Sequence, residues 1–178
     1  MSMKLEASYD RVEAPVVLGA NSASFPTSEG LMSAVLLSAS RIIDTEHERL
    51  GTWMHAQGAG RWRQGATCIG LERHGEIVAS AMFDWYNGAS IFAHIAVTGR
   101  ISHEWLHRIC HYPFVQLQCQ VVIGLVSSTN LAAQRFDEHF GFQKQVTLPG
   151  ADTHGDLLIY TLQKADCRFI TRRHYGKV

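Results

Sequence analysis

A near-continuous apolar run, QVVIGLVS, occupies residues 120–127. Such a run is typical of a strand covered on both faces, because a strand with one solvent face alternates apolar and polar residues. A helix is expected before it at residues 102–112, disturbed near Pro113, and a further strand at residues 90–97. Strand, helix and strand in this order cross over right-handedly, so the two strands are expected to be parallel neighbours.

Residues 66–97 read as a three-stranded antiparallel meander with turns at residues 73–76 and 86–89. We expect a type I′ hairpin at Asn87-Gly88, since both central residues of that turn need positive φ. Two more strands are predicted at residues 143–148 and 156–163, separated by the loop 149–155.

Before the meander, apolar residues repeat at helical spacing. This spacing predicts a helix that starts at the N-cap candidate Ser28 and runs to about Glu46. A further helical turn and a Gly-rich loop are expected within residues 50–65. A strand is also expected at Lys4–Tyr9.

The 178 residues suit one domain, and 16 Lys plus Arg balance 16 Asp plus Glu. Net charge therefore gives no reason to expect nucleic acid as a partner. No run approaches the roughly 20 apolar residues of a membrane span, and the first ten residues lack the apolar core of a secretory signal. We expect a cytoplasmic protein without a membrane partner. Four scattered cysteines without a CxxC pair indicate buried free thiols.

The stretch after the apolar run, SSTNLAAQRFDEHFGF, predicts a short helix with defined ends. Asn130 can cap its start through the side-chain oxygen, which leaves the side-chain N–H groups for a ligand. Gly141 can take the left-handed conformation that ends a helix, and Phe142 can pack back on the last turn.

This pattern, Asn130, Ala133, Phe136, Gly141 and Phe142 after an apolar strand, resembles the signature of the GNAT superfamily of N-acyltransferases. The stretches HYPFVQLQC, NLAAQRFDEHFGF and DCRF resemble GNAT-like proteins of phages and prophages. The resemblance implies an α+β fold: a mixed, mostly antiparallel sheet with a central, splayed parallel pair, flanked by helices. It implies one GNAT-like domain over residues 1–178, with a core at about 28–164 and a basic tail at 165–178.

In the family, the pantetheine arm of an acyl-CoA, commonly acetyl-CoA, lies between the splayed strands. By resemblance, Ile95 and Val97 provide backbone groups for it, and Asn130 and Ala133 line its path. The pyrophosphate is expected at the start of the helix near Ser102, where free N–H groups favour anions. Gly99, Arg100, Ile101 and Ser102 are the candidates, although the chain reads TGRISHEW where the family has a glycine-containing phosphate loop.

Acyl transfer to an amine needs a base for the ammonium and an acid for the departing thiolate. His94 is the first candidate base and Asp84 the second. Asp137 stands where family members carry a tyrosine acid, and it needs a raised pKa for that role. Tyr112 and Tyr160 are alternative acids, although packing in the core or at its rim is the simpler explanation for both.

The sequence leaves two other functions open. His103, Glu104 and His107 spell HExxH, the spacing of a zinc hydrolase helix, but the extended pattern needs Gly and His where Cys110 and Pro113 stand. We therefore assign no metal site. The resemblance also allows a non-catalytic phage virion or host-interaction protein. The acceptor, a small-molecule or protein amine, is not specified by the sequence, and phage structural partners and a homodimer both stay open.

Overall fold

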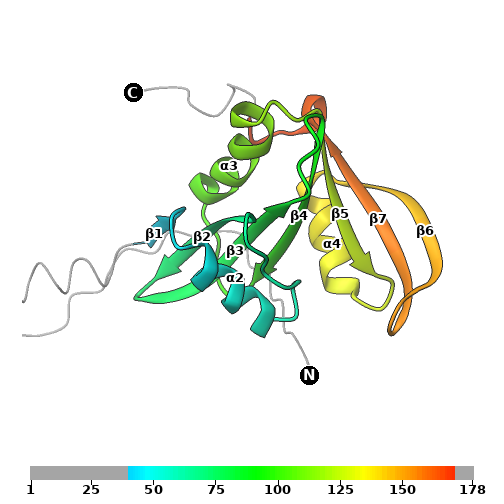
Figure 1. Cartoon of the computed structure of the whole chain (residues 1–178), viewed down its shortest axis with the longest axis horizontal. Coiled ribbons are helices and arrows are strands. Elements are labelled where there is room, and N and C mark those ends of the chain that lie inside the picture. The colour runs from blue at the N-terminus through cyan, green and yellow to red at the C-terminus, as the bar shows by residue number, and fades with distance from the viewer. Residues whose placement is uncertain (1–39, 171–178) are drawn as a thin grey trace, which may run out of the picture.

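The computed structural model of the chain describes residues 40–170 (Figure 1). Seven strands form one sheet in the order β1-β2-β3-β4-β5-β7-β6. The strands are β1 (Ser40–Ile43), β2 (Thr67–Arg73), β3 (Glu76–Asp84), β4 (Ser90–Val97), β5 (Val121–Ser127), β6 (Gln143–Asp152) and β7 (Gly155–Gln163). The helices are α2 (His47–Ala56), α3 (His103–His111) and α4 (Leu131–Phe140), with short turns η1 (Tyr112–Gln116) and η2 (Lys164–Asp166).

The pairing of β4 with β5 is parallel, and the other five strand pairings are antiparallel. This confirms the mixed, mostly antiparallel sheet and the parallel pair predicted on either side of α3. Pro113 lies just beyond α3, where the backbone continues as the π-helical turn η1. No helix in residues 40–170 has the length and apolar character that crossing a membrane requires.

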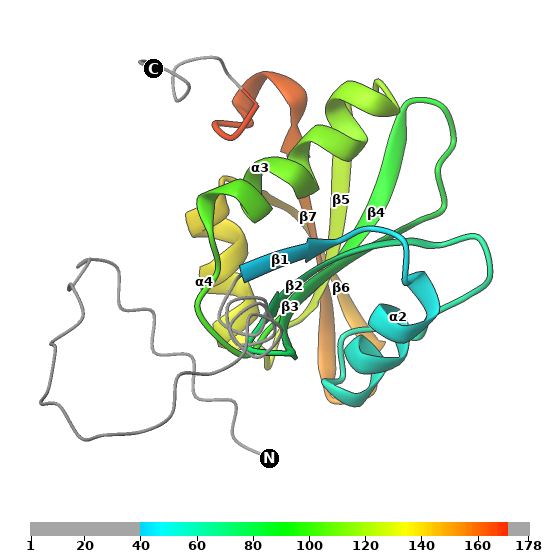
Figure 2. The same cartoon turned by 90° about the vertical axis from the view of Figure 1, so that its left-hand side faces the viewer.

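The sheet separates two apolar layers. Helices α3 and α4 cover one face of the sheet and α2 the other (Figure 2). The larger layer includes Ile91 of β4, Trp105 of α3 and Phe140 of α4. The smaller one lies between the sheet and α2, where Leu50 and Met54 are fully buried. Successive side chains of a strand point to opposite faces, so each strand of the β2–β4 meander contributes to both layers.

The predicted helix from Ser28 to about Glu46 is wrong over its last part, where residues 40–43 form β1. Ile42 and Ile43 pair with Leu71 and Gly70 of β2. Cross-strand pairing of these β-branched residues outweighs the local helical spacing. The helix begins later, at His47, and the expected Lys4–Tyr9 strand and residues 28–39 lie outside the described range.

The type I′ prediction at Asn87-Gly88 is also wrong. Gly88 has a φ of 93°, but Asn87 has no positive φ; its Oδ1 accepts from the backbone N–H groups of Ala89 and Ser90 at 3.0 and 2.8 Å. This is an Asx turn within a five-residue connection. Two consecutive positive φ values, 53° and 82°, occur at His74 and Gly75, in the two-residue turn between β2 and β3.

The C-terminal boundary of the core lies beyond the expected residue 164. Cys167 and Phe169 are buried, and the Phe169 ring centroid lies 4.8 Å from that of Phe140. The expected loop 149–155 is mostly strand, since β6 extends to Asp152 and β7 starts at Gly155. All four cysteines are free and buried, as predicted.

Candidate functional site

Strands β4 and β5 pair along only half of their length. The parallel register runs from Ser90↔Val121 to Ala93↔Gly124 and stops there. Beyond Gly124, β5 stays paired with β7 on its other side, while β4 stays paired with β3 up to Val97. The two strands therefore separate into a slot, as the family resemblance implied.

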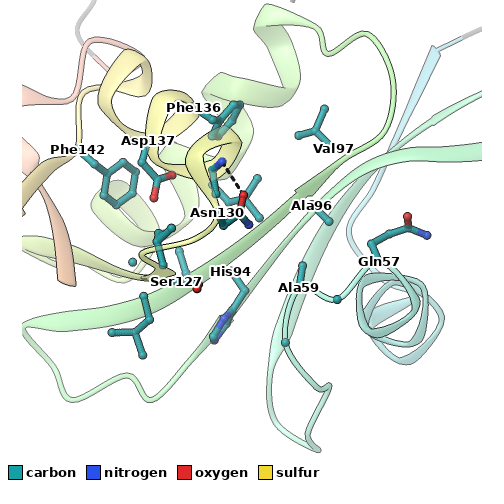
Figure 3. Close-up of a pocket in the computed structure, with 18 of the residues that line it drawn as sticks. Gln57, Ala59, His94, Ala96, Val97, Ser127, Asn130, Phe136, Asp137 and Phe142 are labelled. Atoms are coloured by element: carbon teal, nitrogen blue, oxygen red, sulfur yellow. Dashed lines mark hydrogen bonds between the residues drawn. The ribbon is translucent and has the colours of Figure 1, made fainter. Parts of the chain in front are cut away.

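A cavity of about 290 Å³ occupies this slot (Figure 3). Its lining comes from the segment after α2, the free halves of both strands, α4 and the β6–β7 hairpin. The lining residues are 57–60, 93–97, 124–127, Asn130, Ala133, Phe136, Asp137, Phe142, Asp152 and Leu157. The cavity thus joins the α4 face of the sheet to its α2 face.

The structure brings six of the predicted site residues together in this cavity: His94, Ile95, Val97, Asn130, Ala133 and Asp137. Asp84 Oδ1 lies 3.5 Å from His94 Nε2, but Asp84 is not one of the residues that line the cavity. The four candidates of the β4–α3 turn, residues 99–102, are also outside the lining. Which of these residues bind a ligand stays a prediction.

The ends of α4 have the capping geometry expected from the sequence. Asn130 Oδ1 accepts from the Ala133 N–H at 3.0 Å, and Gly141 has a φ of 118°. The Phe142 N–H donates to the Asp137 carbonyl at 2.9 Å, so the chain turns back over the last turn. The cap uses the side-chain oxygen of Asn130 and leaves its NH₂ group beside the cavity (Figure 3).

Asp137 lies in the cavity wall with only 8% of its surface exposed. Burial, and secondarily the charge of Glu138, raises the pKa of its carboxyl to about 7. A Cβ added to Gly124 would lie 3.5 Å from Asp137 Oδ2, so the carboxyl sits directly over the point where the strands separate. Such a carboxyl carries a proton in a large fraction of molecules near neutral pH, as a general acid requires.

The hydroxyl groups of the two alternative acids, Tyr112 and Tyr160, both donate hydrogen bonds within the protein. The Tyr112 hydroxyl donates to Thr67 Oγ1 at 2.9 Å, and the Tyr160 hydroxyl donates to Glu138 Oε1 at 3.1 Å. Burial, together with Glu138, raises the pKa of Tyr160 to about 12. Neither tyrosine lines the cavity, so Asp137 is the one of the three candidate acids that lies in its wall.

His94 lies on the α2 face of the sheet, at the opposite end of the cavity from α4, and Asp84 lies on the same face of the sheet. His94 opposes Met82 in the register, which makes Asp84 its diagonal neighbour on the same face. His94 Nε2 lies 3.5 Å from Asp84 Oδ1, and the two side chains are 24% and 10% exposed. An imidazole in such a cavity is a candidate general base.

Sequence reasoning missed the segment at residues 57–60, hereafter the 57–60 loop, which closes the cavity on the α2 face. Gly58 and Gly60 have φ values of 76° and 88°, which only glycine adopts readily. A Cβ on Gly60 would lie 3.3 Å from His94 Nδ1, so this loop lies against the imidazole. The only signal in the sequence was the glycine spacing in AQGAG.

The β4–α3 turn is bonded back to the sheet. The N–H groups of Thr98 and Gly99 both donate to the Val78 carbonyl, at 2.9 and 3.2 Å. A Cβ on Gly99 would lie 3.1 Å from Val78 Cβ, so glycine allows this close packing. Ser102 caps α3 by accepting from the Trp105 N–H at 3.2 Å, and Arg100 is exposed beside this helix start.

The HExxH segment forms the first turns of α3. Trp105 within it is fully buried, and its indole N–H donates to the Ile69 carbonyl at 3.1 Å, which fixes the helix on the sheet. The His107 and His111 rings lie 5.6 Å apart. Residues 40–170 contain no cluster of three His, Cys, Asp or Glu side chains that could hold a metal ion.

No protein-family model and no curated protein sequence matches the chain. Solved structures do match it. The spermidine/spermine N-acetyltransferase SpeG from Vibrio cholerae, in complex with manganese ions, aligns with a TM-score of 0.58 at 13% identity over 73% of this chain and 95% of that one. A mutant of the same spermidine N-acetyltransferase gives a TM-score of 0.60 at 12% identity, over 74% and 98%. A chimera of SpeG and hSSAT gives 0.59 at 11%, over 75% and 100%. The chain therefore has the fold of the GNAT acetyltransferases.

Proposed function

We propose that this chain is an acyl-CoA-dependent N-acyltransferase that moves an acetyl group to a primary amine by direct attack. The observation that carries the proposal is the cavity between β4 and β5, with His94 at its α2 end and Asp137 at its α4 end. An enzyme that joins two substrates in one ternary complex needs such a passage, with a base near the acceptor and an acid near the leaving group.

Acetyl-CoA enters as a co-substrate from the α4 side. Its pantetheine arm lies along the unpaired edge of Ile95–Val97, with the NH₂ group of Asn130 within reach. The pyrophosphate lies at the start of α3, where first-turn N–H groups lack intrahelical partners and Arg100 adds positive charge. Because Thr98 and Gly99 already donate to Val78, fewer loop N–H groups serve the phosphates, and affinity is expected to be modest.

His94 removes a proton from the acceptor ammonium, and the neutral amine attacks the thioester carbonyl in the slot. The carbon–nitrogen bond forms, and the tetrahedral intermediate then collapses. The carbon–sulfur bond breaks, the nitrogen releases its second proton to solvent, and Asp137 donates its proton to the departing sulfur. The products are the amide and CoA with a free thiol. The carboxylate of Asp137 regains a proton readily, because burial favours its neutral form.

The acceptor class is a primary amine, on either a small molecule or a protein. Polyamines are the first acceptors to assay, since the compared proteins are named for spermidine and spermine. The carboxylate of Asp152 lines the cavity near β5 and can attract a cationic acceptor. Its pKa is lowered chiefly by the Ser127 hydroxyl, so it is charged at neutral pH.

The decisive experiment is calorimetric titration of the full chain with acetyl-CoA, followed by thiol release assays with a panel of amines. Saturable binding and amine-dependent release of CoA are expected. His94→Ala should keep acetyl-CoA binding but lower turnover about 100-fold or more near neutral pH. No binding at millimolar acetyl-CoA, or full turnover by His94→Ala, would contradict the proposal.

A non-catalytic role in a phage virion or in host interaction is the second candidate. It is favoured by one observation, the use of the Thr98 and Gly99 N–H groups within the protein itself. Under this alternative, acetyl-CoA gives no heat, and every amine gives the background rate of thiol release. The same titration therefore decides between the two functions.

A further inference from the structure

Asp84 has a buried carboxylate oxygen that its surroundings leave without a hydrogen bond. Its Oδ1 atom is inaccessible to solvent and accepts no hydrogen bond in the structure. A buried oxygen without a hydrogen-bond donor lowers the stability of the folded state, so the presence of Asp84 here needs a physical explanation. The nearest basic group is His94 Nε2, at 3.5 Å.

The other neighbour of this carboxylate cannot act as a base. Burial raises the pKa of the Cys68 thiol to about 12, and the negative charge of Asp84 is the second cause. The thiol therefore lies near this carboxylate. Cys68 therefore stays neutral at any physiological pH. His47 on α2 interacts with the backbone of Cys68, through Nδ1 at 3.1 Å from both its N and its O. His94 is therefore the basic side chain beside this carboxylate.

The two ring nitrogens of His94 face different surroundings. Nε2 faces Asp84, whereas Nδ1 faces the 57–60 loop, where a Cβ on Gly60 would come within 3.3 Å. A carboxylate only accepts hydrogen bonds, so the nitrogen beside it must carry the proton. The other nitrogen then holds the lone pair.

Building on the proposed function, we propose that Asp84 is not a second base but a positioning residue, which holds the proton on His94 Nε2 and turns the basic Nδ1 toward the acceptor. The same carboxylate stabilises the imidazolium once Nδ1 has taken a proton from the ammonium. The 3.5 Å separation shortens to a hydrogen bond when that charge forms, since such contacts are often long in ligand-free enzymes.

Nitrogen-15 NMR of the histidine rings in the ligand-free full chain tests this directly. His94→Gln identifies the His94 signals by their loss. In the wild type, Nε2 should show the shift of a protonated nitrogen and Nδ1 that of a bare one. Asp84→Asn should move the proton to Nδ1 in a large fraction of molecules, because the Asn NH₂ group can then donate to Nε2. Asp84→Ala, which offers no acceptor, should give a mixture of tautomers.

Glu72→Gln is the matched control. Glu72 is a partly buried carboxylate of the same sheet, 14% exposed, whose partners are Arg41 and Arg49 at 3.2 and 2.9 Å. This variant should leave the His94 tautomer and kcat unchanged, whereas Asp84→Asn should lower kcat at least about tenfold with little change in KM for acetyl-CoA. Wild-type His94 with its proton on Nδ1, or an unchanged tautomer in both Asp84 variants, would overturn the proposal. If the tautomer follows Asp84 but acetyl-CoA does not bind, the positioning role stands and the proposed function fails.

Discussion

Gln134 of α4 binds the end of β5 through its side chain: its Nε2 lies 3.2 Å from the Ser127 carbonyl oxygen. The same nitrogen lies 3.0 Å from the carbonyl oxygen of Ser128. Carbonyls that leave a sheet need other donors, and Gln134 supplies them where β5 has already parted from β4. The helix that forms one wall of the cavity thus also fixes the strand that forms the other.

Gln134→Leu is expected to destabilise the protein by about 1 to 3 kcal/mol, because the Ser128 carbonyl loses the Gln134 donor and the Ser127 carbonyl keeps only the Asn130 N–H at 3.0 Å. Acetyl-CoA binding should weaken as well, since the end of β5 becomes mobile. Urea unfolding and calorimetry measure the two effects. Gln145→Leu is the control: Gln145 also donates to a backbone carbonyl, that of Gln143 at 3.3 Å, but on the exposed edge strand. Equal stability of the two variants would refute the role of Gln134.

Gly60→Ala should damage catalysis more than Gly65→Ala, although both substitutions strain the backbone. The φ values are 88° and 93°, so each alanine costs about 1 kcal/mol. Only the Cβ at Gly60 meets other groups, His94 Nδ1 at 3.3 Å and Met82 Cε at 3.2 Å, whereas Gly65 has open space. We expect similar melting temperatures, with kcat/KM for the acceptor about tenfold lower in Gly60→Ala alone. Equal kinetics in the two variants would show that the loop does not position His94.

Asp137 should make the protein less stable as the pH rises toward neutrality. Its pKa is about 7 when folded and near 3.8 when unfolded, so between these values the folded state holds a proton that the unfolded state has released. The contribution of Asp137 to stability is therefore largest below pH 4, falls by about 1.4 kcal/mol per pH unit, and levels off above pH 7. The total change is about 4 kcal/mol.

Urea unfolding of the wild type and Asp137→Asn between pH 4.5 and 8 measures this effect as a difference. The stability advantage of the Asn variant should grow with pH and become constant above about pH 7. Asp152→Asn is the control, because the lowered pKa of Asp152 predicts a loss of stability only under more acid conditions. Parallel curves for the wild type and Asp137→Asn would mean that Asp137 ionises normally.

The sequence predicted those parts of the fold that depend on neighbouring residues. Helix α4 is one example, because the cap of Asn130 and the left-handed Gly141 are set by local chemistry. The parallel pairing of β4 with β5 is another, since the handedness of the crossover leaves few alternatives. The splay between them followed from the family resemblance rather than from the residues.

Features that depend on distant contacts could not be predicted in this way. The segment Ser40–Ile43 becomes a strand only because β2, some thirty residues later, offers an edge to pair with. The pKa of Asp137 depends on burial under the packed α4 face, while the sequence showed only an acid in the place of a tyrosine. The contact between Gly60 and His94 likewise joins a loop to a strand with no pattern that links them.

Asn130 serves both as a helix cap and as a candidate ligand for the cofactor, and two substitutions separate these roles. Asn130→Ser keeps an oxygen that can accept from the Ala133 N–H but removes the side-chain NH₂ group, whereas Asn130→Ala removes both. The alanine variant should lose about 1 kcal/mol of stability, and the serine variant should match the wild type. Both should bind acetyl-CoA more weakly, by roughly a factor of 5 to 10, if the NH₂ group donates to the pantetheine arm. Thermal unfolding and calorimetry on the three proteins distinguish the roles: wild-type affinity in Asn130→Ser would restrict Asn130 to capping, because the missing NH₂ group is the only ligand donor that this variant lacks.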